Sequence, residues 1–327
     1  MGAVLTPRRY PDVPESRRLF YDNGTLKVAG TGTTDRTTDI VKAGETILTV
    51  GDWTMPRRFR QQGTNITEIA TTFLDEAGRN IQPYGLWRCA ATADLDHDGD
   101  LDFVLGNLGT NTRLHASPEE PAVLYTGDYD GNGSPDPLVG VYYADRSGAR
   151  HRYPVHNRDD VVRQLPKIKN RFSTYRAFGE VTFEALLADA APEDFVEANT
   201  LESVWLENIG ESTFVMHVLP TAAQMSPIND ILITDIDEDG FLDLLLSGND
   251  YGTESNGGRS DASNGLLLRG NGAGDFTPVP TSESGFYLPG DGRDLVELTD
   301  RTGQRMMVAA QNGGTLQFYT ITHRDLK

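Results

Sequence analysis

The stretch ADLDHDGDLDFVLGN, from Ala93 to Asn107, decides the fold of this chain. Its aspartates occupy positions 1, 3, 5 and 9 of a nine-residue loop: Asp94, Asp96, Asp98 and Asp102. That spacing lets a tight loop turn successive carboxylates toward one hard cation, and Gly99 suits the sharp turn at position 6, where a Cβ would be disfavoured. Oxygen ligands without Cys or His indicate Ca²⁺ rather than zinc or copper.

Two further copies of this loop keep the same register. The second is DYDGNGSPD, with candidate ligands at positions 1, 3, 5 and 9: Asp128, Asp130, Asn132 and Asp136. The third is DIDEDGFLD, with candidate ligands Asp235, Asp237, Asp239 and Asp243. Position 7, where such loops use a backbone carbonyl, adds Asp100, Ser134 and Phe241. A single Asp- and Gly-rich run could equally be a solvated turn or a calcium loop. Three copies in one register favour calcium loops and predict about three Ca²⁺ ions.

The residues that follow each loop exclude an EF-hand. An EF-hand needs a bidentate Glu at position 12, which is Leu105, Val139 and Leu246 here. Short apolar runs come before and after the loops and predict buried strands of a few residues. The loops are therefore expected to join strands.

This pattern of DxDxDGxxD between strands resembles the FG-GAP/VCBS repeats of integrin-α-type β-propellers. The likeness is strongest to bacterial repeat proteins associated with the ASPIC/UnbV segment, relatives of cartilage acidic protein. It extends over nearly the whole chain, through strings such as EANTLESVWLENIG, GRSDASNGLLLRGNGAGDF and SGFYLPGDGRDL. The resemblance implies an all-β fold, a β-propeller of four-stranded blades with calcium loops between strands. It implies no defined activity.

The spacing of the loops indicates one propeller-type domain over 1–327, with about five blades and a partial one. Eroded copies of the loop are expected to begin at 39 and 298, where only Asp39 with Gly44, and Asp300 with Gly303, keep their places. The families it resembles commonly close at seven blades, so the chain is expected to be an incomplete ring, as in a fragment of a longer protein, or a rearranged one. Asp22-Asn23-Gly24 predicts a hairpin near the N-terminus.

An insertion over 145–200 differs from the rest of the chain in its residue pattern and composition. Asn157 and Thr182 are expected to cap two short helices. The insertion is rich in Arg and Lys, with interleaved aromatic residues. Either it is a solvated helical cap whose cations offset the acidic propeller, or it is a face for an anionic ligand such as a uronic-acid polysaccharide.

Composition narrows the partners and the compartment. The net charge is −19, and three bound Ca²⁺ would bring it to −13, so nucleic acid is not expected as a partner. Cys89 is the only cysteine, which excludes an intrachain disulfide and suggests a small buried residue. No membrane span or signal peptide is visible, yet millimolar calcium is an extracellular condition. We therefore expect part of a secreted protein, located outside the cell or on its surface.

Three functions remain open at this stage. The leading hypothesis is a calcium-stabilised binding or adhesion module for glycans or surface proteins. The alternative is a polysaccharide-acting, lyase-like enzyme, for which His151, His156 and Arg152 are the only candidate group, since no common catalytic motif is present. The third is a non-catalytic scaffold completed by another chain. The polar run after Gly248 either lines a ligand cleft with Trp53 or Trp87 or forms a structured turn region.

Overall fold

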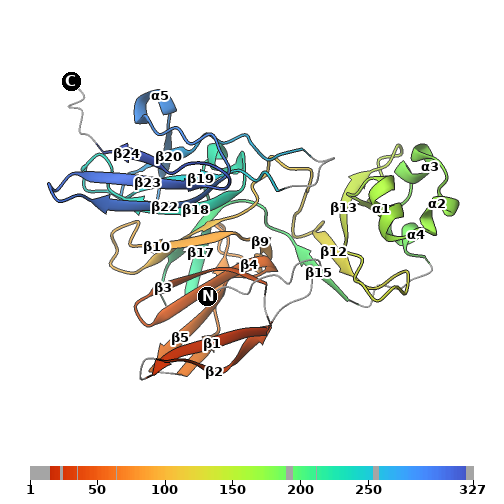
Figure 1. Cartoon of the computed structure of the whole chain (residues 1–327), viewed down its shortest axis with the longest axis horizontal. Helices are drawn as coiled ribbons and strands as arrows, with labels where there is room; N and C mark the ends of the chain where they lie inside the picture. The colour runs from red at the N-terminus through yellow and green to blue at the C-terminus, as the bar shows by residue number, and fades with distance from the viewer. Residues whose placement is uncertain are drawn as a thin grey trace. The chain divides into compact units, whose positions relative to one another are not determined.

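Strands make up most of the regular structure, and nearly all of them pair antiparallel (Figure 1). The computed structural model describes residues 15–22, 25–34, 36–63, 65–188, 194–210, 212–252 and 258–321, with side chains from residue 36 onward. The described part of the chain is all-β with a few short helices, as expected. No helix in it is long and apolar enough to cross a membrane.

The chain divides into two compact units. One unit contains residues 1–37 and 113–200, and the other contains residues 38–112 and 201–327. The chain leaves the second unit after strand β11 (Asp102–Gly106) and re-enters it before β16 (Val204–Asn208), which pairs antiparallel with β11. The predicted insertion, 145–200, lies within this longer excursion.

Two sheets of the second unit contain the strands of its N-terminal part, and one of them also contains β16 and β17. One sheet contains β3 (Thr37–Ala43), β4 (Thr46–Thr54), β5 (Arg57–Gln62), β6 (Asn65–Ile69) and β9 (Gly85–Leu86). The other has the order β10-β11-β16-β17-β7-β8, with β10 (Cys89–Ala93), β17 (Thr213–Val218), β7 (Thr72–Leu74) and β8 (Asn80–Ile81). Only β17 and β7 pair in parallel in this sheet.

Two further sheets come from the C-terminal part. The four-stranded sheet contains β18 (Ile228–Thr234), β19 (Asp243–Gly248), β20 (Leu266–Gly270) and β21 (Phe276–Val279). The three-stranded sheet contains β22 (Gly292–Thr299), β23 (Arg305–Gln311) and β24 (Gln317–Thr320). A 3₁₀ turn (Thr221–Gln224) and α5 (Thr281–Ser284) lie in the connections.

The first unit combines a hairpin, a sheet and helices. Strands β1 (Glu15–Asp22) and β2 (Thr25–Thr34) pair antiparallel as predicted, although the turn residues 23–24 lie outside the described part. The sheet has the order β14-β13-β12-β15, with β12 (Ala122–Thr126), β13 (Leu138–Ala144), β14 (Arg150–Pro154) and β15 (Asp194–Ala198). The helices are α1 (Arg158–Gln164), α2 (Ile168–Arg171), α3 (Tyr175–Gly179) and α4 (Phe183–Leu186).

Both predicted helix caps are confirmed. The side chain of Asn157 accepts a hydrogen bond from the amide of Asp160, and that of Thr182 accepts one from Ala185. Each oxygen satisfies an amide that the first helical turn leaves unpaired. The apolar face of the helices then packs on β12 and β13 in one core, which includes Val123, Leu138, Val161, Phe183 and Leu186.

The two eroded loops do not keep the expected register. Asp39 lies inside strand β3, and the chain turns only at Gly44, so no loop begins at 39. Leu298 lies inside β22, and the turn begins at Asp300, whose carboxylate accepts the amides of Thr302 and Gln304 at 2.7 and 3.0 Å. A carboxylate that binds its own turn replaces the loop at this position.

Candidate functional site

Each of the three acidic loops joins two neighbouring antiparallel strands, as expected. The first connects β10 to β11, the second β12 to β13, and the third β18 to β19. The apolar runs around them are buried strands: Val104, Leu124 and Leu244 are each 0% exposed. The strands are therefore fixed by the core, and the loops lie at their ends.

Carboxylates converge in all three loops. In each loop three of them bring one oxygen apiece within 4.8 Å of the others: Asp94, Asp96 and Asp102 in the first; Asp128, Asp130 and Asp136 in the second; and Asp235, Asp237 and Asp239 in the third. Of the other predicted acidic ligands, Asp98 and Asp100 of the first loop and Asp243 of the third lie outside these clusters.

The loops share a pattern of backbone hydrogen bonds. The amide of the glycine at position 6 donates to the carboxylate at position 1 in every loop: Gly99 to Asp94 at 3.2 Å, Gly133 to Asp128 at 2.7 Å and Gly240 to Asp235 at 3.0 Å. The side chain at position 5 accepts the amide of position 7: Asp98 from Asp100, Asn132 from Ser134 and Asp239 from Phe241. These bonds leave the position 7 amides occupied and fold each loop around its first carboxylate.

Position 9 is the buried end of each loop. Asp102, Asp136 and Asp243 are 0%, 3% and 2% exposed, and one oxygen of each accepts the amide of position 2 at 2.9 to 3.0 Å. Burial raises the pKa of Asp102 to about 6 and also raises the pKa values of Asp136 and Asp243. Without a cation, these carboxylates are held in an environment that disfavours their charge.

In two loops the position 9 carboxylate also reaches the next strand of its sheet. The second oxygen of Asp102 accepts the amide of Asn208, at the end of β16, at 2.8 Å. The second oxygen of Asp243 accepts the amide of Gly270, at the end of β20, at 3.0 Å. The first and third loops are thus joined to three strands rather than two.

The backbone conformation at position 4 of the loops was not predicted from the sequence. The residue at position 4 has a positive φ in all three: His97 at 61°, Gly131 at 79° and Glu238 at 56°. Only the second loop has a glycine there, so residue type gave little signal. The left-handed backbone at positions 4 and 6 makes the two tight turns that direct the carboxylates inward.

Two buried atoms test whether a cation fits these loops. Oδ1 of Asp94 and Oδ1 of Asp235 are buried and have no hydrogen-bond partner among the described residues. A buried carboxylate oxygen without a partner is costly, because it has lost its water without replacement. Both atoms belong to the position 1 aspartates of the converging clusters, so the donor set fits a hard cation.

The third loop has two arginine contacts that the described residues do not make with the other two loops. Nε of Arg269, on β20, lies 2.7 Å from Oδ2 of Asp237. Nη1 of Arg305, on β23, donates to the carbonyl of Asp235 at 2.8 Å, while its Nε donates to Glu297 at 2.6 Å. Arg305 therefore supports the loop, whereas Arg269 occupies a carboxylate that a cation would need.

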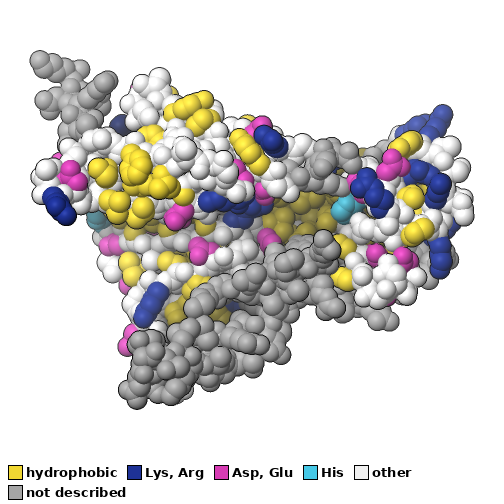
Figure 2. Space-filling model, viewed as in Figure 1, with side chains coloured by type: hydrophobic (Ala, Val, Ile, Leu, Met, Phe, Trp, Pro, Cys, Tyr) yellow, Lys and Arg dark blue, Asp and Glu magenta, His cyan; other side chains and the backbone are white. Residues whose placement is uncertain are grey.

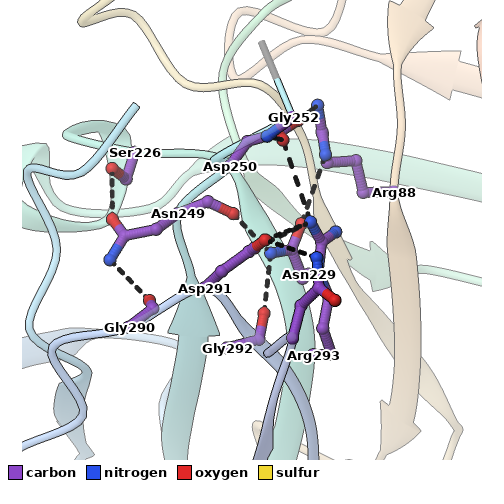
Figure 3. A network of polar contacts seen from close by, with 11 residues as sticks. Arg88, Ser226, Asn229, Asn249, Asp250, Gly252, Gly290, Asp291, Gly292 and Arg293 are labelled. Carbon is purple, nitrogen blue, oxygen red and sulfur yellow. Dashed lines mark hydrogen bonds and ion pairs between the residues drawn. The ribbon is translucent and has the colours of Figure 1, made fainter. Parts of the chain in front are cut away.

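A second polar cluster lies elsewhere in the same unit, at the start of β10 and β22 and the end of β19 (Figure 3). Arg88 pairs with Asp250 at 2.9 Å, and Arg293 pairs with Asp291 at 2.7 Å. Asn249, fully buried with φ of 78°, donates to the carbonyls of Ser263 and Gly290. Sequence reasoning did not single out Arg88, Asp291 or Arg293, which come from distant strands.

The contacts of this cluster support the structured turn rather than a cleft. Most of its side chains contact one another or the backbone of the loops around them. The two tryptophans proposed as cleft residues are in the core: Trp53 is 5% exposed and Trp87 is 0% exposed, with its Nε1 donating to the carbonyl of Thr54. The cleft interpretation is wrong for these two residues.

The three candidate catalytic residues make separate contacts. Nε2 of His156 accepts the amide of Val139 at 3.1 Å, and burial lowers the pKa of this histidine. His151 is exposed and lies 3.5 Å from Asp145, while Arg152 contacts two tyrosines. The structure does not assemble them into an acid–base group. Cys89 is buried as expected, and burial raises its pKa, which disfavours a reactive thiolate.

Comparison with known proteins adds little to this geometry. No protein-family model matches the chain, and no curated protein matches it. Among solved structures, an endo-arabinase from Bacteroides thetaiotaomicron VPI-5482 is similar at 12% identity, covering 92% of this chain and 83% of its own, with a TM-score of 0.33. A likeness this weak identifies no fold family. The likeness to FG-GAP/VCBS propellers therefore stays a resemblance.

Proposed function

We propose that this protein is a calcium-stabilised, propeller-like binding module that acts outside the cell on a glycan. The observation that carries the calcium part is the repetition of one loop geometry three times, with converging carboxylates at the end of a strand pair. Two of the three loops also contain a buried carboxylate oxygen that has no partner.

The three loops would hold one Ca²⁺ each. Their side-chain carboxylates at positions 1, 3 and 9, or 1, 3 and 5 in the third loop, would be the main ligands. The ion would neutralise carboxylates that otherwise repel one another in one turn, and it would complete the strand connection. At a hundredfold excess over its dissociation constant, one ion contributes about 2.7 kcal/mol to stability.

The binding role rests on what the described residues do not provide for catalysis. The histidines and the arginine considered for a lyase contact different residues and do not form one acid–base group. A carboxylate that binds Ca²⁺ is also a poor general base, because the ion favours its ionised form. A rigid scaffold with stabilised loops is well suited to presenting a binding surface. Millimolar calcium, which such sites need, makes an extracellular or cell-surface location part of the proposal.

The test is a thermal melt with and without EDTA, combined with metal analysis and a glycan array. About three Ca²⁺ per chain, a large fall in melting temperature with EDTA, and retention of one class of glycan would support the proposal. A chain without calcium that melts at the same temperature in EDTA would overturn the calcium part. Turnover of a bound polysaccharide would favour the enzyme instead.

A further inference from the structure

Arg152 lies in an unusual position on strand β14, in the unit that carries the helices. Its guanidinium extends across the sheet from β14 to β12. Nη1 donates to the hydroxyl of Tyr125, on β12, and Nη2 donates to the hydroxyl of Tyr142, on β13, at 3.1 Å. Its Cζ lies 5.7 Å from the centre of the Tyr125 ring and 5.0 Å from that of Tyr142.

A glycine makes this path possible. Gly140, on β13, is paired with Val123 of β12 and with Pro154 of β14. A Cβ at this position would come within 3.0 Å of the Arg152 side chain and within 2.7 Å of Phe183. The sheet therefore has a gap in its side-chain layer where the arginine lies.

Arg152 makes no direct ion pair among the described residues, although Glu184 lies near enough to Tyr125 to add to the effect of burial on the pKa of that phenol. The Nε of Arg152 is buried without a hydrogen-bond acceptor among the described residues. Arg150, two residues earlier on the same strand, pairs with Glu120. A partly buried guanidinium that donates only to neutral phenols is expensive to keep, because it has given up water without gaining a counter-ion.

The hydroxyl hydrogens of the two tyrosines are available to a hydrogen-bond acceptor. Each hydroxyl oxygen accepts from Arg152, and the described residues offer no acceptor for either phenolic hydrogen. Burial raises the pKa of Tyr125, which keeps its proton in place. Tyr125 is also stacked on Phe183, with ring centres 4.4 Å apart. The group thus presents a cation and two donors, with no carboxylate among them.

The insertion concentrates its basic residues in one part. Over 145–200 the chain has nine Lys and Arg against nine Asp and Glu, but all nine basic residues lie between 146 and 176, where there are only two Asp. Figure 2 shows basic side chains gathered over the helices of this unit. Lys167, Lys169 and Arg176 are exposed. Such a surface attracts anions over a distance of about one Debye length.

We propose that Arg152, Tyr125 and Tyr142 form a site for a carboxylate or sulfate group of an acidic polysaccharide. The anion would receive the phenolic hydrogens and the outer edge of the guanidinium, and would supply the counter-ion that the chain lacks. Charge-assisted bonds to such a group are about twice as strong as neutral ones. The inference rests on the proposed glycan-binding function and names its ligand class and its place.

The test compares four forms of the full chain in calcium: wild type, Arg152→Gln, Tyr142→Phe and Arg150→Gln. Arg150→Gln is the matched control, because it removes the same charge from the same strand but from an arginine that already has a partner. Binding of oligogalacturonate, its neutral methyl ester and single-stranded DNA is measured by calorimetry. The thermal shift caused by sulfate, against chloride at equal ionic strength, is measured in parallel.

We expect oligogalacturonate to bind wild type and Arg150→Gln similarly, and Arg152→Gln about tenfold or more weakly. Tyr142→Phe should bind a few-fold more weakly, and the methyl ester should not bind. Melting temperatures of the variants show whether folding is intact. Because an unpaired cation stabilises little, Arg152→Gln should melt close to wild type.

The other outcomes separate the two proposals. Equal oligogalacturonate binding by all four forms would overturn the site and leave glycan binding standing. A sulfate shift that depends on Arg152, without glycan binding, would keep the anion site and overturn the glycan function. No response to either probe would overturn both. DNA binding that depends on Arg152 as strongly as sugar binding would overturn the polysaccharide assignment.

Discussion

At the scale of single residues, the loops depend on aspartates that serve different purposes. The carboxylate at position 1 accepts the glycine amide with one oxygen; in Asp94 and Asp235 the other oxygen is buried and has no partner among the described residues. The carboxylate at position 9 is buried and bonded to backbone amides. The unpaired oxygen at position 1 is therefore suited to bind a cation, whereas the carboxylate at position 9 connects neighbouring strands through its hydrogen bonds.

The carboxylate at position 3 gives the most direct test of ligation. Asp96→Ala should remove calcium from the first loop only, and Asp237→Ala from the third loop only, so each lowers the metal content by about one ion per chain. Asp300→Ala is the control, because Asp300 binds the amides of its own turn. Metal analysis after dialysis measures all three. A lower calcium content in Asp300→Ala would contradict the assignment.

The buried aspartates also predict how stability depends on pH. Burial raises the folded-state pKa of Asp102 to about 6, above the value of about 3.9 for an unfolded chain. The contribution of such a group is complete below the unfolded pKa and is lost as pH rises through about 6. In EDTA, the melting temperature should therefore fall between about pH 4 and 6. With Ca²⁺, which binds the ionised form, it should rise over the same range.

Asp230 provides the background for this measurement. It lies on β18, outside the loops, and burial raises its pKa to about 6 as well. Its contribution to stability should fall with rising pH both with and without calcium. Asp102→Asn should remove only the pH dependence of the melting temperature that comes from the first loop. Identical pH profiles in calcium and EDTA would show that the loops bind no ion.

At the scale of elements, short-range signals in the sequence were sufficient for the loops and for two helices. Apolar runs beside the loops gave the strands, and Asn157 and Thr182 gave the starts of α1 and α4. The starts of α2 and α3 were not predicted, although Thr174 caps α3 in the same way as Thr182 caps α4. No apolar periodicity long enough to mark them is present in four or five residues.

Contacts that depend on strand pairing could not be predicted. Arg152 meets Tyr125 only because β13 lies between their strands with Gly140 at the crossing point. Arg88 and Asp250 meet because distant segments of the chain pack side by side. The prediction of a loop at 39 was wrong for a related reason: the Asp39 carboxylate accepts a hydrogen bond from the amide of Ala90, on β10, at 2.8 Å. Spacing along the chain contains none of this information.

The third loop should bind calcium more weakly than its ligands suggest. Arg269 neutralises Asp237 through a contact of 2.7 Å, and the ion has to compete with it. Arg269→Gln should therefore raise the calcium affinity of this loop by roughly two- to fivefold, the range expected for an exposed ion pair. Arg57→Gln, which breaks the exposed pair with Glu68, is a matched control that should leave all affinities unchanged. A lower affinity in Arg269→Gln would overturn the competition.

At the scale of the whole molecule, charge is the dominant consideration. A chain of net charge −19 repels itself when metal-free, and three ions would reduce the charge to −13. Added NaCl screens this repulsion, so the melting temperature in EDTA should rise between low salt and about 0.2 M, and the calcium form should respond less. Differential scanning calorimetry measures both. An equal response in the two forms would place the repulsion outside the loops.

The contact between Asp102 and Asn208 has a consequence for how the chain is made. The two residues are 106 positions apart, and the entire second acidic loop and its sheet lie between them. Strand β11 must therefore wait during synthesis until β16 has left the ribosome, and closing so long a segment carries an entropic penalty. An ion held by the first loop would fix its aspartate in place during that delay. When β16 emerges, the amide of Asn208 would then find the Asp102 carboxylate already in its final position.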